Sequence, residues 1–552
     1  MECSDDAPVV RTPSPRSPGT GEDDKSDEME EFLAGFISRM EPVKPEVVQA
    51  VTAAHALAGF GRALRTGSAM GPRRSFQVTK IDQFWSHSWH GSKWRKILTA
   101  FYLFNGMVAS VSATFICLVV MVAYSVHVLP HLRGPTFPEE SGLCSLVGFL
   151  VYLLLLFFWR PQKKVFLDVL CINQENEQDK SEGIISIGAF LKCSETLLVL
   201  WDPSYTRRLW CVFEMAAFLH SRPMGQKPKL VIRPTILGQC FICIPIALSC
   251  TLLAIGFLPW AEIDSQKFIL WPLMGLCGAI GNYLSVAAVR GYYRSLQELK
   301  VELRDFDVKG TLSWCCSTNH VDNGEAMPCD RKIVFKCITS WFGSLEAFEQ
   351  TVRTDVLRNL TDQLSEDIFT YRQCVAATVP LLWHFMDSAS SKLHFHGSEQ
   401  LNGAVRELIR GLGWGCGVLP ILFFIGFQLM YLLQGRCRSC IWLCLEVGIN
   451  SLILGVLILL FLGALELEQR CWLLENDFWN YEQRNQWDLL PGTVLFSVIM
   501  VSSALVLFGS RAHAQAVLRF LSWPPVHPEK PPETAVEPMP PEVHQPRELV
   551  PL

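Results

Sequence analysis

Long stretches with almost no charged residues constrain the fold of this chain more than any other feature. Seven such stretches contain no Asp, Lys or Arg, and Glu446 is their only acidic residue. Because about 20 apolar residues are needed to cross a bilayer, each stretch is expected to form a transmembrane helix. The seven expected spans are 103–129, 142–159, 236–258, 269–289, 412–433, 441–464 and 491–510. The sequence therefore predicts a multi-pass membrane protein.

The composition agrees with that prediction. Hydrophobic residues make up 50% of the chain and charged residues only 18%, which is more apolar than an ordinary soluble enzyme. The net charge is -5 and no long basic run is present, so the class of nucleic-acid-binding proteins is excluded. The expected partner is the lipid bilayer, and the sequence does not say which membrane.

An eighth stretch, 373–386, is free of charge but short, and it contains Pro380 and His384. It is expected to be an interfacial helix, with a full crossing left open. Lys and Arg cluster before the first and third spans and after the second and fourth. Positive charge favours the cytoplasmic side, so the first four spans are expected to form two hairpins entering from the cytoplasm, with both termini cytoplasmic.

The remaining segments differ from the spans in composition. Residues 1–28 and 523–552 are rich in Pro, Ser and acidic residues and are expected to be disordered tails. Residues 29–75 have helical apolar spacing and are expected to lead into the next segment. Residues 291–410 are expected to form a soluble region that contains several cysteines.

Two segments around the first hairpin, 76–97 and 163–222, have the pattern of one split α/β domain. The first is a strand followed by a helix. The second alternates between strands at 165–169 and 196–201 and helices at 184–193 and 209–220. Apolar strands that alternate with helices predict a parallel, doubly wound sheet, here interrupted by the transmembrane hairpin.

Three motifs in these segments carry a resemblance. Residues 84–88 read FWSHS, residues 166–174 read FLDVLCINQ, and residues 204–215 read SYTRRLWCVFEM. In this order they resemble the Toll/interleukin receptor (TIR) family, and DVLCINQ is also similar to a signature of fungal heterokaryon-incompatibility domains. The resemblance covers 80–97 and 163–222. A TIR-like module interrupted by membrane hairpins is similar to the arrangement in uncharacterised dinoflagellate proteins.

The resemblance implies a fold and two functions. Many TIR domains act in signalling by self-association, whereas enzymatic members cleave the glycosidic bond of NAD. In the enzymatic branch Glu214 would be the catalytic residue, because a carboxylate stabilises the positive charge that develops as the bond breaks. The cleft residues implied are Ser86, His87, Trp89, Asp168, Trp210 and Cys211.

Each of these residues also has a plainer interpretation. A glutamate such as Glu214 on an amphipathic helix is commonly solvated or forms a cap, and His87 among tryptophans is commonly a packed core residue. Asp168 can cap the helix that follows its strand. Signalling or assembly is therefore the favoured function, with an NAD glycohydrolase that uses Glu214 as the alternative. A channel or transporter is the second alternative, and it would depend on the sparse polar residues Glu446, Asn450 and Asn282.

Four residues of the cysteine-containing region could bind a metal. Cys315, Cys316, His320 and Cys329 supply the sulfur and nitrogen ligands that zinc prefers. The spacing is not that of a standard zinc finger, because two of these cysteines are adjacent and none of them form a C-x-x-C pair. Buried cysteines of a cytosolic core are the competing interpretation.

Overall fold

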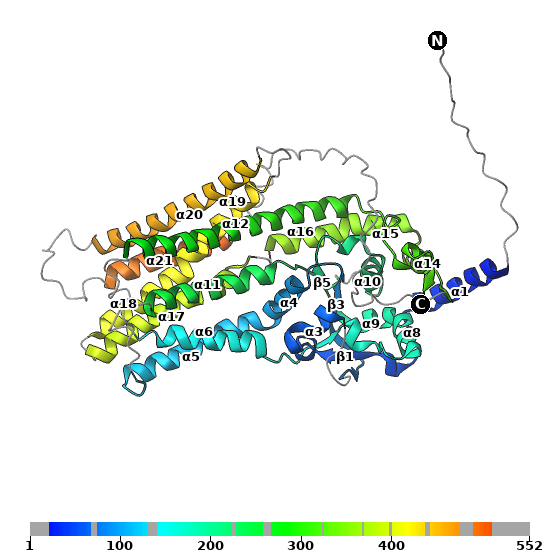
Figure 1. The fold of residues 1–552 in the computed structure, drawn as a ribbon, viewed down its shortest axis with the longest axis horizontal. Coiled ribbons are helices and arrows are strands. Elements are labelled where there is room, and N and C mark those ends of the chain that lie inside the picture. Colours follow the sequence, from blue (N-terminus) through cyan, green and yellow to red (C-terminus); the bar gives the residue numbers. More distant parts are fainter. Residues whose placement is uncertain are drawn as a thin grey trace, which may run out of the picture.

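The computed structural model consists of an α/β module and a bundle of long helices, which lie end to end (Figure 1). The description covers residues 21–67, 74–130, 141–223, 228–257, 267–322, 325–366, 369–396, 400–435, 442–473 and 490–509. Residues 1–20 of the expected N-terminal tail 1–28, and the expected C-terminal tail 523–552, lie outside these ranges.

The module is built on a six-stranded sheet with the order β2-β1-β4-β3-β5-β6. The strands are β1 (Gln49–Thr52), β2 (Phe76–Gln77), β3 (Ile81–His87), β4 (Lys164–Phe166), β5 (Ser194–Trp201) and β6 (Leu230–Pro234). Strands β4, β3, β5 and β6 are parallel, whereas β1 is antiparallel to both β4 and β2. The predicted parallel sheet is thus confirmed for four strands. The antiparallel edge is new, because it is formed by very short strands without a clear apolar period.

Helices cover the sheet and close its core. Those of the module are α2 (Ala53–Ala56), α3 (Ala58–Thr66), α7 (Asp168–Cys171), α8 (Glu177–Ile185), α9 (Ile187–Cys193) and α10 (Leu209–His220). Phe84 of β3 stacks on Phe166 of β4 with ring centroids 4.5 Å apart, and Phe166 also contacts Phe190 of α9. All three rings are fully buried, as expected for strands with helices on both faces.

The cysteine-containing region adds a further layer of helices on the module. Its elements are α13 (Trp314–Ser317), β7 (Val321–Asp322), β8 (Glu325–Ala326), α14 (Asp330–Phe342), α15 (Leu345–Thr351) and α16 (Leu357–Glu366). The N-terminal helix α1 (Gly21–Ser38) packs against α14, where Lys332 forms an ion pair with Asp27 at 2.8 Å. Residues 21–28, expected in the N-terminal tail, therefore lie in a helix.

The bundle contains the apolar stretches of the sequence. Its helices are α4 (Lys93–Phe101), α5 (Met107–Ser125), α6 (Leu143–Phe158), α11 (Leu237–Phe257), α12 (Lys267–Arg304), α17 (Tyr371–His396), α18 (Leu401–Leu412), α19 (Leu419–Leu432), α20 (Trp442–Leu473) and α21 (Leu490–Gly509). A π-helical turn, Tyr102–Gly106, joins α4 to α5 without a break in the helix. The chain thus passes directly from the module into the bundle.

In the part of the chain that the structure describes, fewer candidate membrane spans are found than the seven expected. Among the described residues, five helices are long and apolar enough to cross a membrane: Lys93–Ser125, Leu237–Ala254, Leu401–Leu432, Cys444–Trp472 and Leu490–Gly509. Helix α6, expected as 142–159, has 16 residues, so it is only ~24 Å long against a bilayer core of ~30 Å. The expected span 269–289 is part of α12, where side chains before residue 283 lie outside the description.

The stretch 373–386 lies within α17, which packs against α5, α6, α11 and α18. Helix α17 therefore lies inside the bundle. Its Asp387 is buried and caps the N-terminus of α6, because it accepts hydrogen bonds from the backbone N–H groups of Cys144 at 2.6 Å and Ser145 at 2.8 Å. The Ser141 hydroxyl donates a third bond to Asp387 at 3.1 Å. One buried carboxylate thus fixes α17 to α6.

The polar residues of the predicted span 441–464 contact α12. The fully buried guanidinium of Arg290 donates to Glu446 at 2.8 Å and to Asn450 at 2.5 Å. Arg294, one turn further along α12, also pairs with Glu446 at 3.1 Å. Glu446 and Asn450 therefore join α12 to α20 in the bundle.

Candidate functional site

All but one of the residues expected to form a cleft come together at the carboxyl edge of the parallel sheet, and Trp210 is the exception. If the four parallel strands β3, β4, β5 and β6 are numbered 1 to 4 along the chain, their order across the sheet is 2-1-3-4. The chain therefore adds β4 on one side of β3 and the later strands on the other side, so the direction of the connections reverses at β3. Doubly wound folds of this kind bind ligands outside the carboxyl ends of their strands at such a point. Strand β3 ends at His87, β4 ends just before Asp168, and β5 ends just before Asp202.

Glu214 lies in the middle of α10 with its side chain directed to the end of β3. It is only 9% exposed. Its Oε2 atom is hydrogen bonded to the Ser86 hydroxyl, which lies 2.6 Å from the Tyr205 hydroxyl. Burial raises the pKa of Glu214 to about 8, since water is replaced by apolar surroundings, and the Ser86 hydrogen bond opposes this only in part. At neutral pH the carboxyl group is therefore mostly protonated.

The hydrogen bonds around Ser86 agree with a protonated Glu214. The Tyr205 hydroxyl lies 3.3 Å from the carbonyl oxygen of Cys211, to which it can donate. Each hydroxyl has a single proton, so a chain from Glu214 through Ser86 and Tyr205 to this carbonyl is complete only if the carboxyl group supplies the first proton. When Glu214 is ionised, Ser86 must donate to it. Only two hydroxyl protons then remain for three contacts, so either the Ser86–Tyr205 contact or the contact of Tyr205 with the Cys211 carbonyl has no hydrogen bond.

Asp168 and His87 lie on the other side of the strand ends. The indole N–H of Trp89 donates to Asp168 Oδ2 at 3.1 Å, and burial raises the pKa of Asp168. The His87 ring packs edge-on against Trp89 with centroids 4.6 Å apart. Among the described residues neither ring nitrogen of His87 has a hydrogen-bond partner. Burial and the nearby charge of Lys96 lower the pKa of His87 well below its usual value, so the imidazole is neutral.

Several members of this cluster were not expected from the sequence. Lys96 is fully buried and donates to the backbone oxygen of Ser88 at 2.5 Å. The Ser204 and Ser88 hydroxyls lie 2.7 Å apart, and the Ser204 hydroxyl and N–H donate to Asp202 at 2.5 and 2.9 Å. The sequence did not indicate a buried Lys96, because a lysine just before a predicted span is expected to lie at the membrane surface.

Trp210 and Cys211, which are adjacent in the sequence and were both implied as cleft residues, lie on different sides of α10. Cys211 belongs to the cluster, since its thiol lies 3.7 Å from the backbone oxygen of His87. Trp210 is directed away from it, and its indole N–H bonds to Asp330 of α14 at 3.3 Å. One turn of α10 thus contacts the sheet on one side and the cysteine-containing region on the other.

The carboxyl edge of the sheet is covered by helices of the bundle. Thr99 of α4 donates to the backbone oxygen of Thr235 at 2.7 Å and accepts from the Gly238 N–H at 3.1 Å. A Cβ atom at Gly238 would lie 2.3 Å from the Leu98 backbone, so this close approach of α11 to α4 requires glycine. On the adjacent side, Glu302 of α12 accepts a hydrogen bond from Thr206 at 2.9 Å.

A cavity of about 280 Å³ remains between the edge and these helices. It is lined by Trp201 at the end of β5 and by Asp202 and Thr235, which directly follow β5 and β6. Side chains of α4, α11 and α12, such as Arg95 and Tyr292, complete the lining. Among the described residues, Glu214 and Ser86 lie outside the lining. The cluster around Glu214 is therefore occluded, with a cavity beside it.

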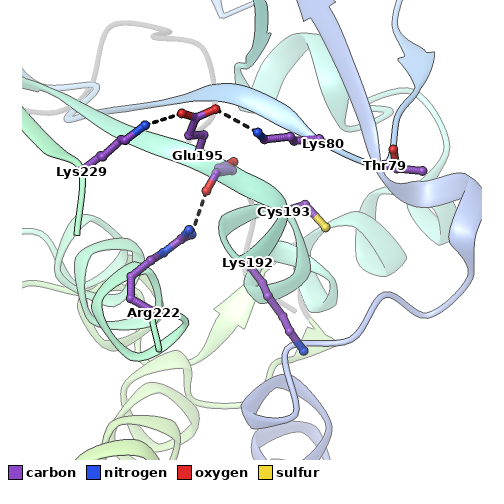
Figure 2. Close-up of a pocket in the computed structure, with 8 residues that line it drawn as sticks. Thr79, Lys80, Lys192, Cys193, Glu195, Arg222 and Lys229 are labelled. Atoms are coloured by element: carbon purple, nitrogen blue, oxygen red, sulfur yellow. Dashed lines mark hydrogen bonds and ion pairs between the residues drawn. The ribbon is translucent and has the colours of Figure 1, made fainter. Parts of the chain in front are cut away.

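A larger hollow of about 550 Å³ lies at the opposite, amino edge of the sheet (Figure 2). Lys80 and Lys229 both pair with Glu195, whose pKa these two hydrogen bonds lower to about 2. Arg222 is held by the backbone oxygens of Leu191 and Ser194 at 2.8 and 2.7 Å. Much of the positive charge in this hollow is thus already paired within the protein.

No protein-family model, no curated protein and no solved structure matches this chain.

Proposed function

We propose that the protein acts in signalling or assembly at a membrane, through a TIR-like α/β module whose state depends on its helical bundle. The support is the way in which the two parts are joined. The helix that leaves β3 continues into the candidate span Lys93–Ser125, and α11 begins three residues after β6. A displacement of these helices would act directly on the strand ends where the polar cluster lies.

The observation that carries the proposal is the occlusion of the cluster. Glu214 is buried and hydrogen bonded, and the edge where doubly wound folds bind ligands is covered by bundle helices. An enzyme that cleaves NAD would need an ionised carboxylate in an open cleft, whereas Glu214 is mostly protonated at neutral pH. Because bundle helices cover the carboxyl edge of the sheet, the module suits a role in which it responds to movements of those helices rather than to a substrate in an open cleft.

Coupling between bundle and module can be tested at Thr99. The Thr99→Val variant loses the hydrogen bonds to Thr235 and Gly238 while it keeps the shape of the side chain. In full-length protein in nanodiscs, we expect faster hydrogen exchange at the ends of β3 and β5. Thr251→Val is the matched control, because Thr251 is exposed and bonds only within α11. Unchanged exchange in Thr99→Val would contradict the coupling.

Assembly is tested by the number of copies in each particle. The full-length protein in nanodiscs, studied by mass photometry across a range of protein-to-disc ratios, is expected to form defined oligomers. Single copies at every ratio would contradict assembly through the module and leave coupled signalling by a monomer.

Cleavage of NAD by Glu214 is the second candidate function. It is favoured by the position of Glu214 and His87 at the carboxyl edge of the sheet, where doubly wound folds bind ligands, and by the lowered pKa of the buried His87, because perturbed groups gather at functional sites. The test is nicotinamide release from NAD by full-length protein and by Glu214→Gln. We expect release from neither. Release by the wild type that is lost in the variant would overturn the proposal in favour of a hydrolase.

A further inference from the structure

Four potential metal ligands lie together on the far side of α10 from the Glu214 cluster. Cys315 and Cys316 are in the short helix α13, His320 is in the turn after it, and Cys329 immediately precedes α14. The donor atoms of all four side chains lie within 4.8 Å of one another. They are brought together although the β7–β8 hairpin separates Cys329 from the other three in the chain.

The separations of the sulfur atoms match a tetrahedral zinc centre. A Zn–S bond of ~2.3 Å and a tetrahedral angle place two sulfur ligands ~3.8 Å apart. The Sγ atoms of Cys315 and Cys316 are 3.8 Å apart, and those of Cys316 and Cys329 are also 3.8 Å apart. The adjacent cysteines, which argued against a zinc site on the sequence alone, thus have the spacing of two ligands of one ion.

The surroundings of these atoms also suit a bound cation. The His320 Nε2 atom is buried, and no residue of the described ranges gives it a hydrogen-bond partner. The Ser313 hydroxyl lies 3.0 Å from the Cys315 sulfur, to which it can donate. A hydroxyl donor of this kind stabilises a thiolate ligand of a metal.

We propose that Cys315, Cys316, His320 and Cys329 bind one zinc ion in a structural site. Four protein ligands complete the tetrahedral coordination and leave no position for a substrate. Cys315 and Cys329 are buried, which suits a structural rather than a catalytic centre.

The proposed zinc site would fix the start of α14 against two other helices. The backbone N–H of Cys329 donates to Glu30 of α1 at 3.0 Å. The next residue, Asp330, accepts the indole N–H of Trp210 in α10 at 3.3 Å. Loss of the ion is therefore expected to loosen both α1 and the turn of α10 that precedes Glu214.

Metal content gives the first test. The full-length protein, purified in nanodiscs without added chelator, is expected to contain one zinc per chain. After exchange with cobalt, the absorption bands of tetrahedral thiolate coordination should appear. Cys316→Ser should lose the metal, whereas Cys337→Ser should keep it, because Cys337 is a buried cysteine of α14 that contacts Ala34 instead. Folded wild type that binds neither zinc nor cobalt would refute the site, as would a disulfide between Cys316 and Cys329 found by mass spectrometry.

Hydrogen exchange provides a second test that does not depend on the variants. Chelation of the metal from the wild type should increase exchange in 27–34, 313–335 and 209–214, and added zinc should reverse it. The sheet at β1 and β4 serves as the internal reference. Bound zinc whose removal leaves exchange at 313–335 unchanged would show adventitious binding and overturn the structural role.

Discussion

Ser86 and Glu214 share a hydrogen bond although they are 128 positions apart in the sequence. The first comes from β3 and the second from α10, and the hairpin of α5 and α6 lies between them in the chain. The bond forms because β3 pairs with β5, whose connection leads into α10. It joins the two halves of the split module at the edge nearest the bundle.

Replacement of Ser86 by Ala should destabilise the module. The variant leaves Glu214 and Tyr205 without their common partner in a buried environment, and a buried polar group without a partner costs about 1–3 kcal/mol. The thermal unfolding midpoint of the protein in nanodiscs should fall accordingly. Ser181→Ala is the control, since Ser181 is exposed and bonds only within α8. Equal midpoints for the two variants would contradict the buried network.

Glu214→Gln should remove one pH dependence of stability. Between pH 4.5 and pH 8 the folded protein keeps a proton on Glu214 that the unfolded chain releases, so wild-type stability falls as the pH rises. The slope for this group is about 1.4 kcal/mol per pH unit. Glutamine cannot ionise, so the variant should gain stability relative to wild type across this window. Parallel curves of unfolding midpoint against pH would show that Glu214 is ionised in the folded protein.

Asp387→Ala should weaken the contact between α17 and α6. The substitution removes the acceptor for two backbone N–H groups at the start of α6, and the loss of an N-cap costs about 0.5–2 kcal/mol. We expect a lower unfolding midpoint and faster hydrogen exchange at 143–146. Asp355→Ala should change neither, because Asp355 is exposed and forms only a 3.7 Å ion pair.

Glu446→Ala should destabilise the bundle more than an ordinary ion-pair variant. It leaves the fully buried Arg290 without its carboxylate. Breaking one side of a fully buried pair costs about 3–5 kcal/mol, which is an upper bound here because Glu446 is 25% exposed and Arg290 still donates to Asn450. The comparison is Glu466→Ala, which removes an exposed pair with Arg470 worth about 0.3–0.5 kcal/mol. Unfolding midpoints in the same lipid measure both. A loss in Glu446→Ala no larger than that in Glu466→Ala would mean that Arg290 is solvated.

The fold was predicted best where apolar runs were long. Helix α10 has the expected bounds, and β5 begins two residues before the expected 196–201. Strands β1 and β6 were missed, because β1 has only four residues and β6 ends in Pro234, which ordinarily marks a strand end or a turn. The expected span 142–159 differs from the structure, since this charge-free stretch forms the 16-residue helix α6, which packs against α17.

The candidate site was predicted in part. The strand ends bring Ser86, Asp168 and Glu214 to one edge, as the motifs implied. The opposite orientation of Trp210 was not foreseen, because the position of α14 depends on contacts between distant segments. The proximity of His320 and Cys329 to Cys315 and Cys316 was also not foreseen, because it depends on the turn after α13 and on the β7–β8 hairpin.

The hairpin of α5 and α6 is also the connection between β3 and β4, which are neighbouring parallel strands in the sheet. During synthesis the ribosome releases β3 first, and its partner β4 follows only after both helices of the hairpin have emerged. In the native arrangement, these two strands can pair only once α5 and α6 have folded back on one another, since both helices lie within the connection between the strands. Completion of the parallel sheet is thereby linked to formation of the helical hairpin.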